Sequence, residues 1–435
     1  MGSVPHLDHH HTSDDFTFNV AIIGGGIGGL ALALALNKYP HINYQIYEAA
    51  PKFSEIGAGV SVGPNARRAL ELIGPDAFRA LTDHLTSNLW PSHQNTWVQY
   101  TIGKGPNADD TITHQRNAYG QQSIHRAKFL DGLVQGVPPQ RAHFNKRLVR
   151  LEDPAPHDKP VKLFFKDGTT ETADCVIGAD GIHSPSRAYI MGSLEAANPV
   201  FSGTVVYRSL VPMDEAVEKL GDEYANNCYI SCGPHRAIMS YPIEFGELLN
   251  VVVMDYKHEN WEHEKWIVPA DWNNLSELFE GWGPQSRGII ELLNKPDLSL
   301  WALHDMPPTP TYFDHNVAML GDAAHATTPF QGQGAGQAIE DALVLSKVLA
   351  KIEDKSQIPN AFSAYDQVRR PRSQKIVSTS RDAGELCGMT MVGVGGDVAK
   401  MKKEFDVRMR WIWGRDQSKQ CAEAVELLEE SMAEC

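Results

Sequence analysis

The chain has 435 residues, 54 Asp and Glu against 39 Lys and Arg, and a net charge of −15. Its hydrophobic content of 42% and charged content of 21% are those of a globular protein long enough for two or three domains. The negative charge argues against nucleic acid or an anionic membrane surface as a partner.

The cysteines and the first residues indicate a protein of a reducing compartment. Of six cysteines only Cys228 and Cys232 lie close together in the sequence, with no histidine or second pair nearby to complete a zinc site. We therefore predict reduced thiols, no metal and a cytoplasmic location. Residues 1–15 lack the apolar core of a signal peptide and are predicted to be a disordered leader.

Residues 20–48 predict a dinucleotide-binding unit. An apolar strand at 20–23 is followed by five glycines in six residues, a helix at 30–36, a second strand at 44–47, and Glu48. In such a unit Gly24 permits a tight turn, Gly26 lets a pyrophosphate approach the backbone, and Gly29 lets the helix lie close to the sheet.

Glu48 is placed to accept hydrogen bonds from an adenosine ribose diol, which favours FAD or NAD over NADP as the nucleotide bound here. The apolar run at 20–36 has the length of a membrane span. Its glycines would make a poor lipid-facing helix, so we predict no stable membrane insertion.

The next segments alternate between helices, loops and strands. A helix is predicted at 64–73 with Gly74 at its end, and irregular loops with short strands near a site at 82–120. Ser123 is predicted to cap a helix at 124–134 that carries His125 and Arg126. Strands follow at 147–151, 161–165 and 171–177, with a hairpin turn at 166–169.

The middle of the chain is rich in strands. Strands predicted at 204–211, 228–230, 237–241 and 248–254 have no helices between them, which indicates an antiparallel sheet and a second domain inserted into the first. A buried strand at 316–320 and a helix at 334–352 follow. Helices near 365–381, 398–411 and 422–433 complete the chain.

Two further turns are compatible with a nucleotide. A strand ends in Gly178-Ala179-Asp180-Gly181, where Asp180 either contacts a ligand or only caps the next helix. The strand at 316–320 ends in Gly321-Asp322, and Pro329 and the glycine-rich start of a helix at Gly334 and Ala335 follow. Asp322 could hold a ribityl hydroxyl, and the positive end of the helix dipole could face a flavin pyrimidine ring.

The three motifs together resemble the single-component FAD-dependent aromatic hydroxylases, the para-hydroxybenzoate and salicylate hydroxylase family, over residues 18–381. The resemblance implies an α/β fold with a Rossmann-like FAD-binding domain, an inserted substrate domain built on a mixed or antiparallel β-sheet, and a helical C-terminus. It divides the chain into an FAD-binding domain at 16–200 and 307–385, a substrate domain at 201–306, and C-terminal helices at 386–435.

The family's FAD contacts map onto particular positions here. Matching residues are Glu48, Ala58, Gly59, Arg126, Asp322 and Ala335, beside Gly24, Gly26, Gly29, Pro329 and Gly334 from the motifs. Asp180 matches a motif used for both FAD and the nicotinamide nucleotide. Arg126 alone would read as an arginine on a helix surface.

The segments 205–209 and 239–242 are similar to strands of fungal polyketide dearomatising monooxygenases of tropolone, sorbicillinoid and azaphilone pathways. That similarity implies that Arg208 and Tyr241 hold a substrate as its phenolate. A fixed guanidinium lowers the pKa of a phenol and orients the ring. Without the resemblance, both would be ordinary residues of half-exposed strands. Trp301, His304 and Trp272 are further candidates for the pocket wall, although core packing explains the tryptophans equally well.

The resemblance implies a monooxygenase that uses NADPH or NADH, O2 and FAD, through a C4a-hydroperoxyflavin, to hydroxylate a phenolic aldehyde or ketone with dearomatisation. A decarboxylating hydroxylase of salicylate type is the alternative. From another class, an FAD reductase or oxidase and a non-catalytic flavin-binding protein remain open. We expect a monomer or homodimer whose partners are a small phenolic substrate and O2.

Overall fold

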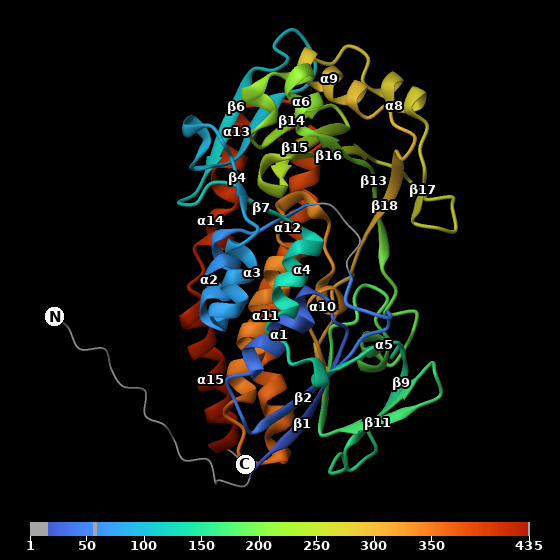
Figure 1. Ribbon diagram of the computed structural model, residues 1–435, viewed down its shortest axis with the longest axis vertical. Helices are drawn as coiled ribbons and strands as arrows, with labels where there is room; N and C mark the ends of the chain where they lie inside the picture. Colours follow the sequence, from blue (N-terminus) through green and yellow to red (C-terminus); the bar gives the residue numbers. More distant parts are fainter. Residues whose placement is uncertain (1–15, 55–58, 434–435) are drawn as a thin grey trace, which may run out of the picture.

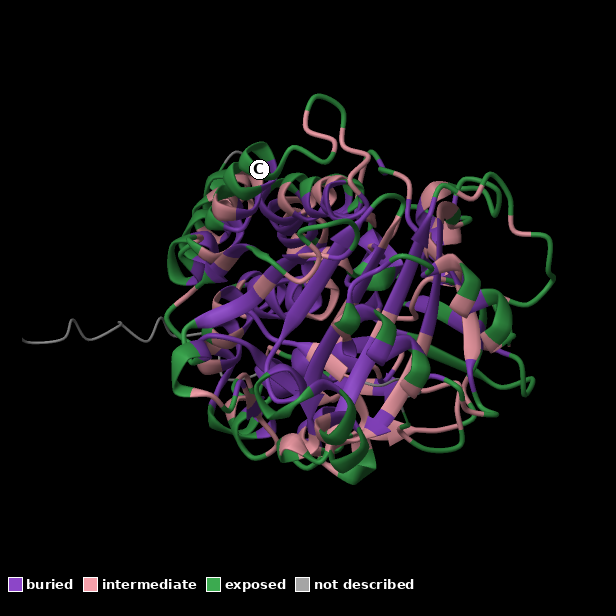
Figure 2. Cartoon of the chain, turned by 90° about the horizontal axis from the view of Figure 1, so that it is seen from above, coloured by how far each residue is buried: buried purple, intermediate pink, exposed green. Residues whose placement is uncertain are grey.

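A computed structural model describes residues 16–54 and 59–433 (Figure 1). The predicted leader and the predicted contact Ala58 lie outside the described residues. The predicted α/β fold class is confirmed: two large sheets and a set of long helices make up the molecule. The strands and inner helix faces are buried, and exposed residues gather on the outer loops and helix surfaces (Figure 2).

The first large sheet is mostly parallel, with strand order β19-β20-β12-β1-β2-β8. Its central strand β1 pairs in parallel with β12 and β2, and β20 pairs in parallel with β12. Its strands are β1 (Phe18–Ile23), β2 (Ile42–Tyr47), β8 (Ala142–His143), β12 (Cys175–Gly178), β19 (Phe313–Asp314) and β20 (Val317–Met319). The ends of β1, β12 and β20 therefore bring the three predicted turns to one edge.

A small antiparallel sheet of β9 (Leu148–Glu152), β10 (Val161–Phe165) and β11 (Thr170–Ala173) lies beside α5 (Pro185–Met191) in Figure 1. The predicted hairpin turn is confirmed, since Gly168 has φ +84° and its N–H donates to the Phe165 carbonyl. The single strand predicted at 171–177 is wrong. It is two strands in two sheets, because the Asp174 carboxylate accepts from the Asn19 N–H (2.7 Å) where the chain passes from β11 to β12.

The second large sheet has eight strands in the order β17-β18-β13-β16-β15-β14-β5-β6. Its pairs are antiparallel except for β14 and β5, so the sheet is mixed. Its strands are β5 (Thr96–Ile102), β6 (Thr111–Arg116), β13 (Val200–Pro212), β14 (Tyr229–Gly233), β15 (Arg236–Ile243), β16 (Leu248–Tyr256), β17 (Ile267–Pro269) and β18 (Ser299–Asp305). β5 and β6 come from the segment predicted as loops with short strands, so this sheet extends beyond residues 201–306.

A second small sheet corrects one helix prediction. β7 (Gln122–His125) pairs with β3 (Gly59–Ser61) and β4 (Thr86–Ser87), so the helix that follows, α4 (Arg126–Val134), begins only at Arg126. Ser123 is not a helix cap: its hydroxyl donates to the Pro242 carbonyl (2.7 Å) from within β7. The local sequence pattern indicated a helix cap because the strands that pair with β7 lie far away in the sequence and leave no local signal.

Fifteen α-helices surround the sheets in the described ranges 16–54 and 59–433. The first nine are α1 (Ile27–Leu36), α2 (Pro64–Ile73), α3 (Pro75–Thr82), α4 (Arg126–Val134), α5 (Pro185–Met191), α6 (Met213–Leu220), α7 (Asp222–Ala225), α8 (Trp272–Leu278) and α9 (Pro284–Leu292). The others are α10 (Asp322–His325), α11 (Gly334–Leu349), α12 (Ile358–Cys387), α13 (Val398–Arg408), α14 (Arg410–Trp413) and α15 (Gln417–Ala433). Among the described helices, none combines the length and the apolar character that crossing a membrane requires.

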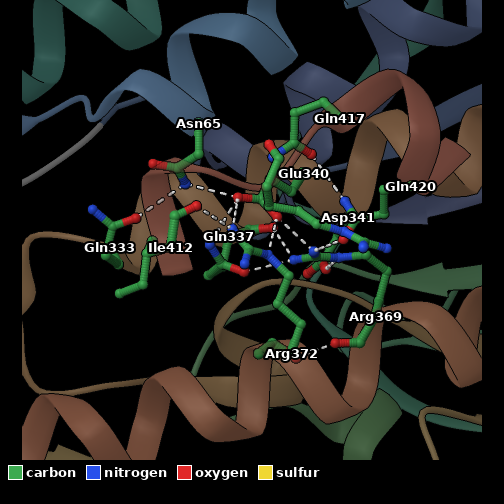
Figure 3. Close-up of polar contacts among 12 residues, drawn as sticks. Asn65, Gln333, Gln337, Glu340, Asp341, Arg369, Arg372, Ile412, Gln417 and Gln420 are labelled. Carbon is green, nitrogen blue, oxygen red and sulfur yellow. Dashed lines mark hydrogen bonds and ion pairs between the residues drawn. The ribbon is translucent and has the colours of Figure 1, made fainter. Parts of the chain in front are cut away.

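A buried network of charges joins α11 to α12 (Figure 3). Arg369 donates to Asp341 (2.7 Å) and to Glu340 (2.6 Å), and Arg372 donates to Glu340 (2.7 Å). Asp341 also accepts from the N–H of Gly321 (3.0 Å). Because Glu340, Asp341 and Arg369 are fully buried, the network fixes α11 and the turn after β20 in one position.

Stability at low pH should depend on this network. Burial by itself would raise the pKa of Glu340, but Arg369 and Arg372 lower this pKa to about 2. A lowered folded-state pKa contributes stability above the ordinary value of 4.5, and this contribution is lost as the pH falls from 4.5 toward 2. Glu340→Gln should therefore reduce the slope of unfolding free energy against pH in this window, measured by urea denaturation. Glu429→Gln on the exposed face of α15 should leave the slope as in the parent; an equal effect of both variants would contradict the assignment.

Candidate active site

A cavity of about 750 Å³ lies between the edge where β1, β12 and β20 end and one face of the eight-stranded sheet. Most of the predicted site residues meet there. The cavity is lined by Gly24, Gly26, Glu48, Gly59, Arg126, Asp180, Arg208, Tyr241, Asp322, Pro329, Gly334 and Ala335. Segments that are far apart in the sequence therefore form one site.

The glycine turn between β1 and α1 has the geometry that each glycine was predicted to serve. Gly24 has φ +104°, which a residue with a side chain rarely adopts. A Cβ on Gly29 would lie 2.1 Å from the Gly24 carbonyl oxygen, so α1 packs against the turn only because Gly29 lacks one. A Cβ on Gly26 would meet no protein atom within 4 Å. Gly26 thus leaves open space at the cavity wall.

Glu48 stands at the end of β2 and faces the same turn. One carboxylate oxygen accepts from the Gly25 N–H (2.7 Å), and the other accepts from the Ala50 N–H (2.7 Å). These bonds hold the carboxylate in place at the cavity wall. Each oxygen retains a second lone pair for a ligand hydroxyl.

The turn after β12 is held by Asp180. Its carboxylate accepts from the Ser184 hydroxyl and from the Ser186 N–H (3.0 Å), whereas Ser184 is the N-cap of α5. Burial raises the pKa of Asp180 in spite of these hydrogen bonds. Asp180 therefore orders the start of α5 and also lines the cavity. Its hydrogen bonds at the start of α5 are compatible with the predicted contact to a ligand.

Arg187 connects this turn to the turn after β20. Its fully buried guanidinium donates to the carbonyls of Ala323 (3.2 Å), Ala324 (3.0 Å) and Pro307 (2.9 Å). Gly321 has φ +60°, and Asp322 follows it as an exposed residue at the start of α10. Buried hydrogen bonds thus fix the backbone on which Asp322 is carried.

The start of α11 forms the next part of the wall. Pro329 begins a short 3₁₀ turn, and Gly334 and Ala335 are the first residues of the 16-residue helix. The first N–H groups of a helix have no partner within the helix and carry the positive end of its dipole. This end of α11 therefore offers donors and partial positive charge to the cavity.

Arg208 and Tyr241 lie on the sheet side of the cavity. Arg208 is a half-buried residue of β13, and within residues 16–54 and 59–433 no carboxylate lies within ion-pair distance of it. Burial lowers the pKa of Arg208, an effect opposed by nearby Tyr241 and reinforced by Arg126. Burial also raises the pKa of Tyr241, so its hydroxyl stays neutral. The ring of Tyr241 packs against Gly59, where a Cβ would lie 2.7 Å from its hydroxyl.

The rest of the sheet wall is apolar, and the motifs did not identify it. These side chains are Val206, Ile230, Met239, Val252, Met254 and Leu303, and Phe330 from the 3₁₀ turn also lines the cavity. A signal was present in the alternation of strands: residues two apart, such as Val252 and Met254, point to the same face. The wall places apolar groups around the half-buried Arg208.

The three further candidates have other contacts. Trp301 lies against Arg208, with the guanidinium carbon 5.2 Å from the ring centroid. His304 stacks on Trp266 at 3.7 Å, and the Trp272 indole donates to the Ile290 carbonyl (2.8 Å). Across the described residues no cluster of three or more His, Cys, Asp or Glu is arranged to hold a metal ion.

Comparison with known proteins agrees with this geometry. The family described as FAD binding domain matches residues 113–380. The 6-methylsalicylate 1-monooxygenase atA of Aspergillus terreus is 48% identical over 94% of this chain and 92% of its own length. The chain belongs to the FAD-dependent aromatic monooxygenases of salicylate hydroxylase type. A salicylate hydroxylase of Pseudomonas putida is 36% identical, with 93% of each chain covered.

The fold comparison supports the same family. The solved structure of a salicylate hydroxylase substrate complex has a TM-score of 0.83 and 34% sequence identity, and the match covers 94% of this chain and 98% of that one. The cofactor of this monooxygenase is FAD. The cavity fits it, because the space above Gly26, the ends of α1 and α11 and the Glu48 carboxylate all face one volume.

Two alanine substitutions should separate cofactor binding from folding. Gly26→Ala adds a methyl group only to open space, so the apoprotein should keep its melting temperature while its FAD affinity falls by at least about tenfold. Gly29→Ala forces α1 away from the turn and should destabilise the apoprotein by about 1–3 kcal/mol. Thermal unfolding of the apoproteins and titration with FAD test both. A Gly26→Ala variant that binds FAD like the parent would contradict the assignment of Gly26.

Proposed function

We propose that this monooxygenase hydroxylates a salicylate at the carbon that bears the carboxylate, with release of CO2. The observation that carries the proposal is Arg208, a half-buried cation that faces the cavity beside Tyr241 without a carboxylate partner in the described chain. An uncompensated cation in an apolar wall favours an anionic ligand. The 48% identity to a 6-methylsalicylate 1-monooxygenase supports a salicylate, with or without an alkyl substituent.

We propose the following residues for FAD. The glycine turn with Gly24, Gly26 and Gly29 and the N-terminus of α1 hold the pyrophosphate, and Glu48 holds the adenosine ribose. Asp322 faces the ribityl chain, and the N-terminus of α11 at Gly334 and Ala335 faces the pyrimidine edge of the flavin. Gly59, Arg126, Asp180 and Pro329 complete the contacts.

The chain's own residues prepare the substrate. Arg208 lowers the pKa of the phenol and holds its oxygen as the phenolate, which makes the ortho carbon nucleophilic. The neutral Tyr241 hydroxyl donates a hydrogen bond that orients the ring, and the apolar wall excludes water. Bound FAD, reduced by NADPH or NADH, supplies from O2 the oxygen atom that enters the ring.

The substituent on the attacked carbon decides the product. A carboxylate leaves as CO2, and the ring becomes aromatic again as a catechol. A methyl group cannot leave, so the same attack on a methylated phenolic aldehyde gives a nonaromatic dienone. Dearomatisation remains a prediction from the resemblance, and the relatives named for salicylates favour the decarboxylating route.

A product assay tests the proposal. The holoenzyme, NADPH or NADH and O2 are incubated with salicylate, with 6-methylsalicylate and with 3-methyl-2,4-dihydroxybenzaldehyde, and products are identified by mass spectrometry. We expect equal consumption of reductant, O2 and salicylate with one CO2 released. A nonaromatic product from the aldehyde alone would favour dearomatisation. Reductant oxidation without an oxygenated product would indicate a reductase or oxidase, and no substrate-stimulated oxidation a non-catalytic flavoprotein.

Arg208→Ala should separate substrate activation from cofactor binding. Loss of the cation removes the stabilisation of the phenolate, so turnover should fall by at least about a hundredfold while bound FAD stays near the parent level. Tyr241→Phe keeps the ring against Gly59 and should cost less, about tenfold. Steady-state kinetics and flavin absorbance measure both. An Arg208→Ala variant that hydroxylates as fast as the parent would refute the phenolate assignment.

Two expectations remain predictions. The five cysteines within the described residues are free and buried, in line with the predicted reducing, cytoplasmic location. The chain is expected to act as a monomer or homodimer. Size-exclusion chromatography with light scattering measures this oligomeric state.

A further inference from the structure

We infer that Trp301 is a positioning residue that holds the Arg208 guanidinium toward the substrate while leaving its charge uncompensated. The inference rests on the proposed function, because it concerns how the same site selects an anion. It starts from the contact between the guanidinium carbon and the indole, 5.2 Å from the ring centroid.

The sheet register puts the two side chains next to each other. β13 pairs with β18 so that Val206 is opposite Trp301 and Arg208 is opposite Ser299. The indole Nε1 donates to the Ser299 hydroxyl (2.9 Å), which fixes the orientation of the ring. Trp301 is half-buried and packs against the apolar cluster that forms the cavity wall. Ser299, Trp301 and Arg208 therefore form one arrangement on two paired strands.

Other arginines of the chain are held differently. Arg236, on β15 of the same sheet, contacts the Asp255 carboxylate at 3.0 Å. Arg369 contacts both Glu340 and Asp341. A carboxylate partner neutralises the cation and occupies its N–H donors. Such a partner next to Arg208 would repel an anionic substrate.

An aromatic partner avoids this cost. A cation–π contact attracts the guanidinium through the ring face and leaves its N–H groups in the guanidinium plane available to a ligand. It also restricts the rotamers of a long side chain, so less conformational entropy is lost when the substrate binds. The contact should therefore raise affinity for anionic substrates and have little effect on neutral analogues of the same shape.

The test compares salicylate with 2-methoxybenzamide, which has a similar shape but neither an ionisable phenol nor a carboxylate. Dissociation constants are measured with the FAD-loaded enzyme from the change in flavin absorbance on titration. In Trp301→Leu we expect the salicylate constant to rise about tenfold and the 2-methoxybenzamide constant to change less than about twofold. Trp301→Phe keeps a ring face and should stay within about threefold of the parent for both ligands. Trp261→Leu, whose indole lies near Phe201 and His263, is the matched control and should match the parent.

Ser299→Ala provides a second measurement that does not remove the tryptophan. Loss of the indole hydrogen bond should raise the salicylate constant about two- to threefold and leave the 2-methoxybenzamide constant unchanged. If Trp301→Leu fails to fold, Ser299→Ala decides. Equal loss for both ligands, or parent-like preference in both variants, would overturn the inference.

The same titrations distinguish failure of the inference from failure of the proposed function. A parent enzyme that does not prefer salicylate to 2-methoxybenzamide would count against the proposed anionic substrate. A parent with this preference, unchanged in Trp301→Leu, would leave the proposed function standing and reject the role of Trp301.

Discussion

The bond between Arg369 and the carboxylates of Glu340 and Asp341 is the constraint on which the site depends. All three groups are fully buried, so loss of any one of them would leave an unpaired charge in the protein interior, which is strongly destabilising. The Asp341 carboxylate accepts a hydrogen bond from the Gly321 N–H (3.0 Å), and the Glu340 carboxylate accepts one from the Asn65 side-chain amide on α2 (2.7 Å). The turn that carries Asp322 and the start of α11 are therefore held by groups outside the cavity.

The chain uses arginine in two opposite ways. Arg369 forms ion pairs with two acids and stabilises the packing of α11 against α12. Arg208 lies against the Trp301 indole and near Tyr241, and no described acid forms an ion pair with it. The first arrangement stabilises a fold at any substrate concentration. The second leaves the guanidinium without a paired acid in the described chain, as its proposed role in binding an anionic substrate requires.

Local patterns were enough to predict the glycine turn, Glu48 and the two acidic turns, because spacing and neighbouring strands determine them. They failed where partners are distant in the sequence. The segment of β5 and β6 was predicted as loops with short strands because β14, the partner of β5, lies more than a hundred residues later. Ser123 was predicted to be a helix cap because the local pattern does not show the pairing of β7. The network of Asn65, Glu340 and Arg369 could not be predicted from a sequence motif, because it depends on how α2, α11 and α12 pack against one another. The roles of Arg208 and Tyr241 were predicted from the resemblance to known monooxygenases, because the strand pattern alone marks both as ordinary strand residues.

The parallel pairing of β14 with β5 has a consequence for how the molecule assembles. β5 is synthesised before β14, and until β14 is made β5 could pair only with β6, as a two-stranded hairpin that is marginally stable alone. A fragment excised at residues 201 and 306 would expose the backbone donors and acceptors of β14 as a bare edge, a template for association between copies. The eight-stranded sheet is therefore incomplete without strands from outside residues 201–306, and gene fusions or swaps of the middle segment would have to carry residues 96–116 with it.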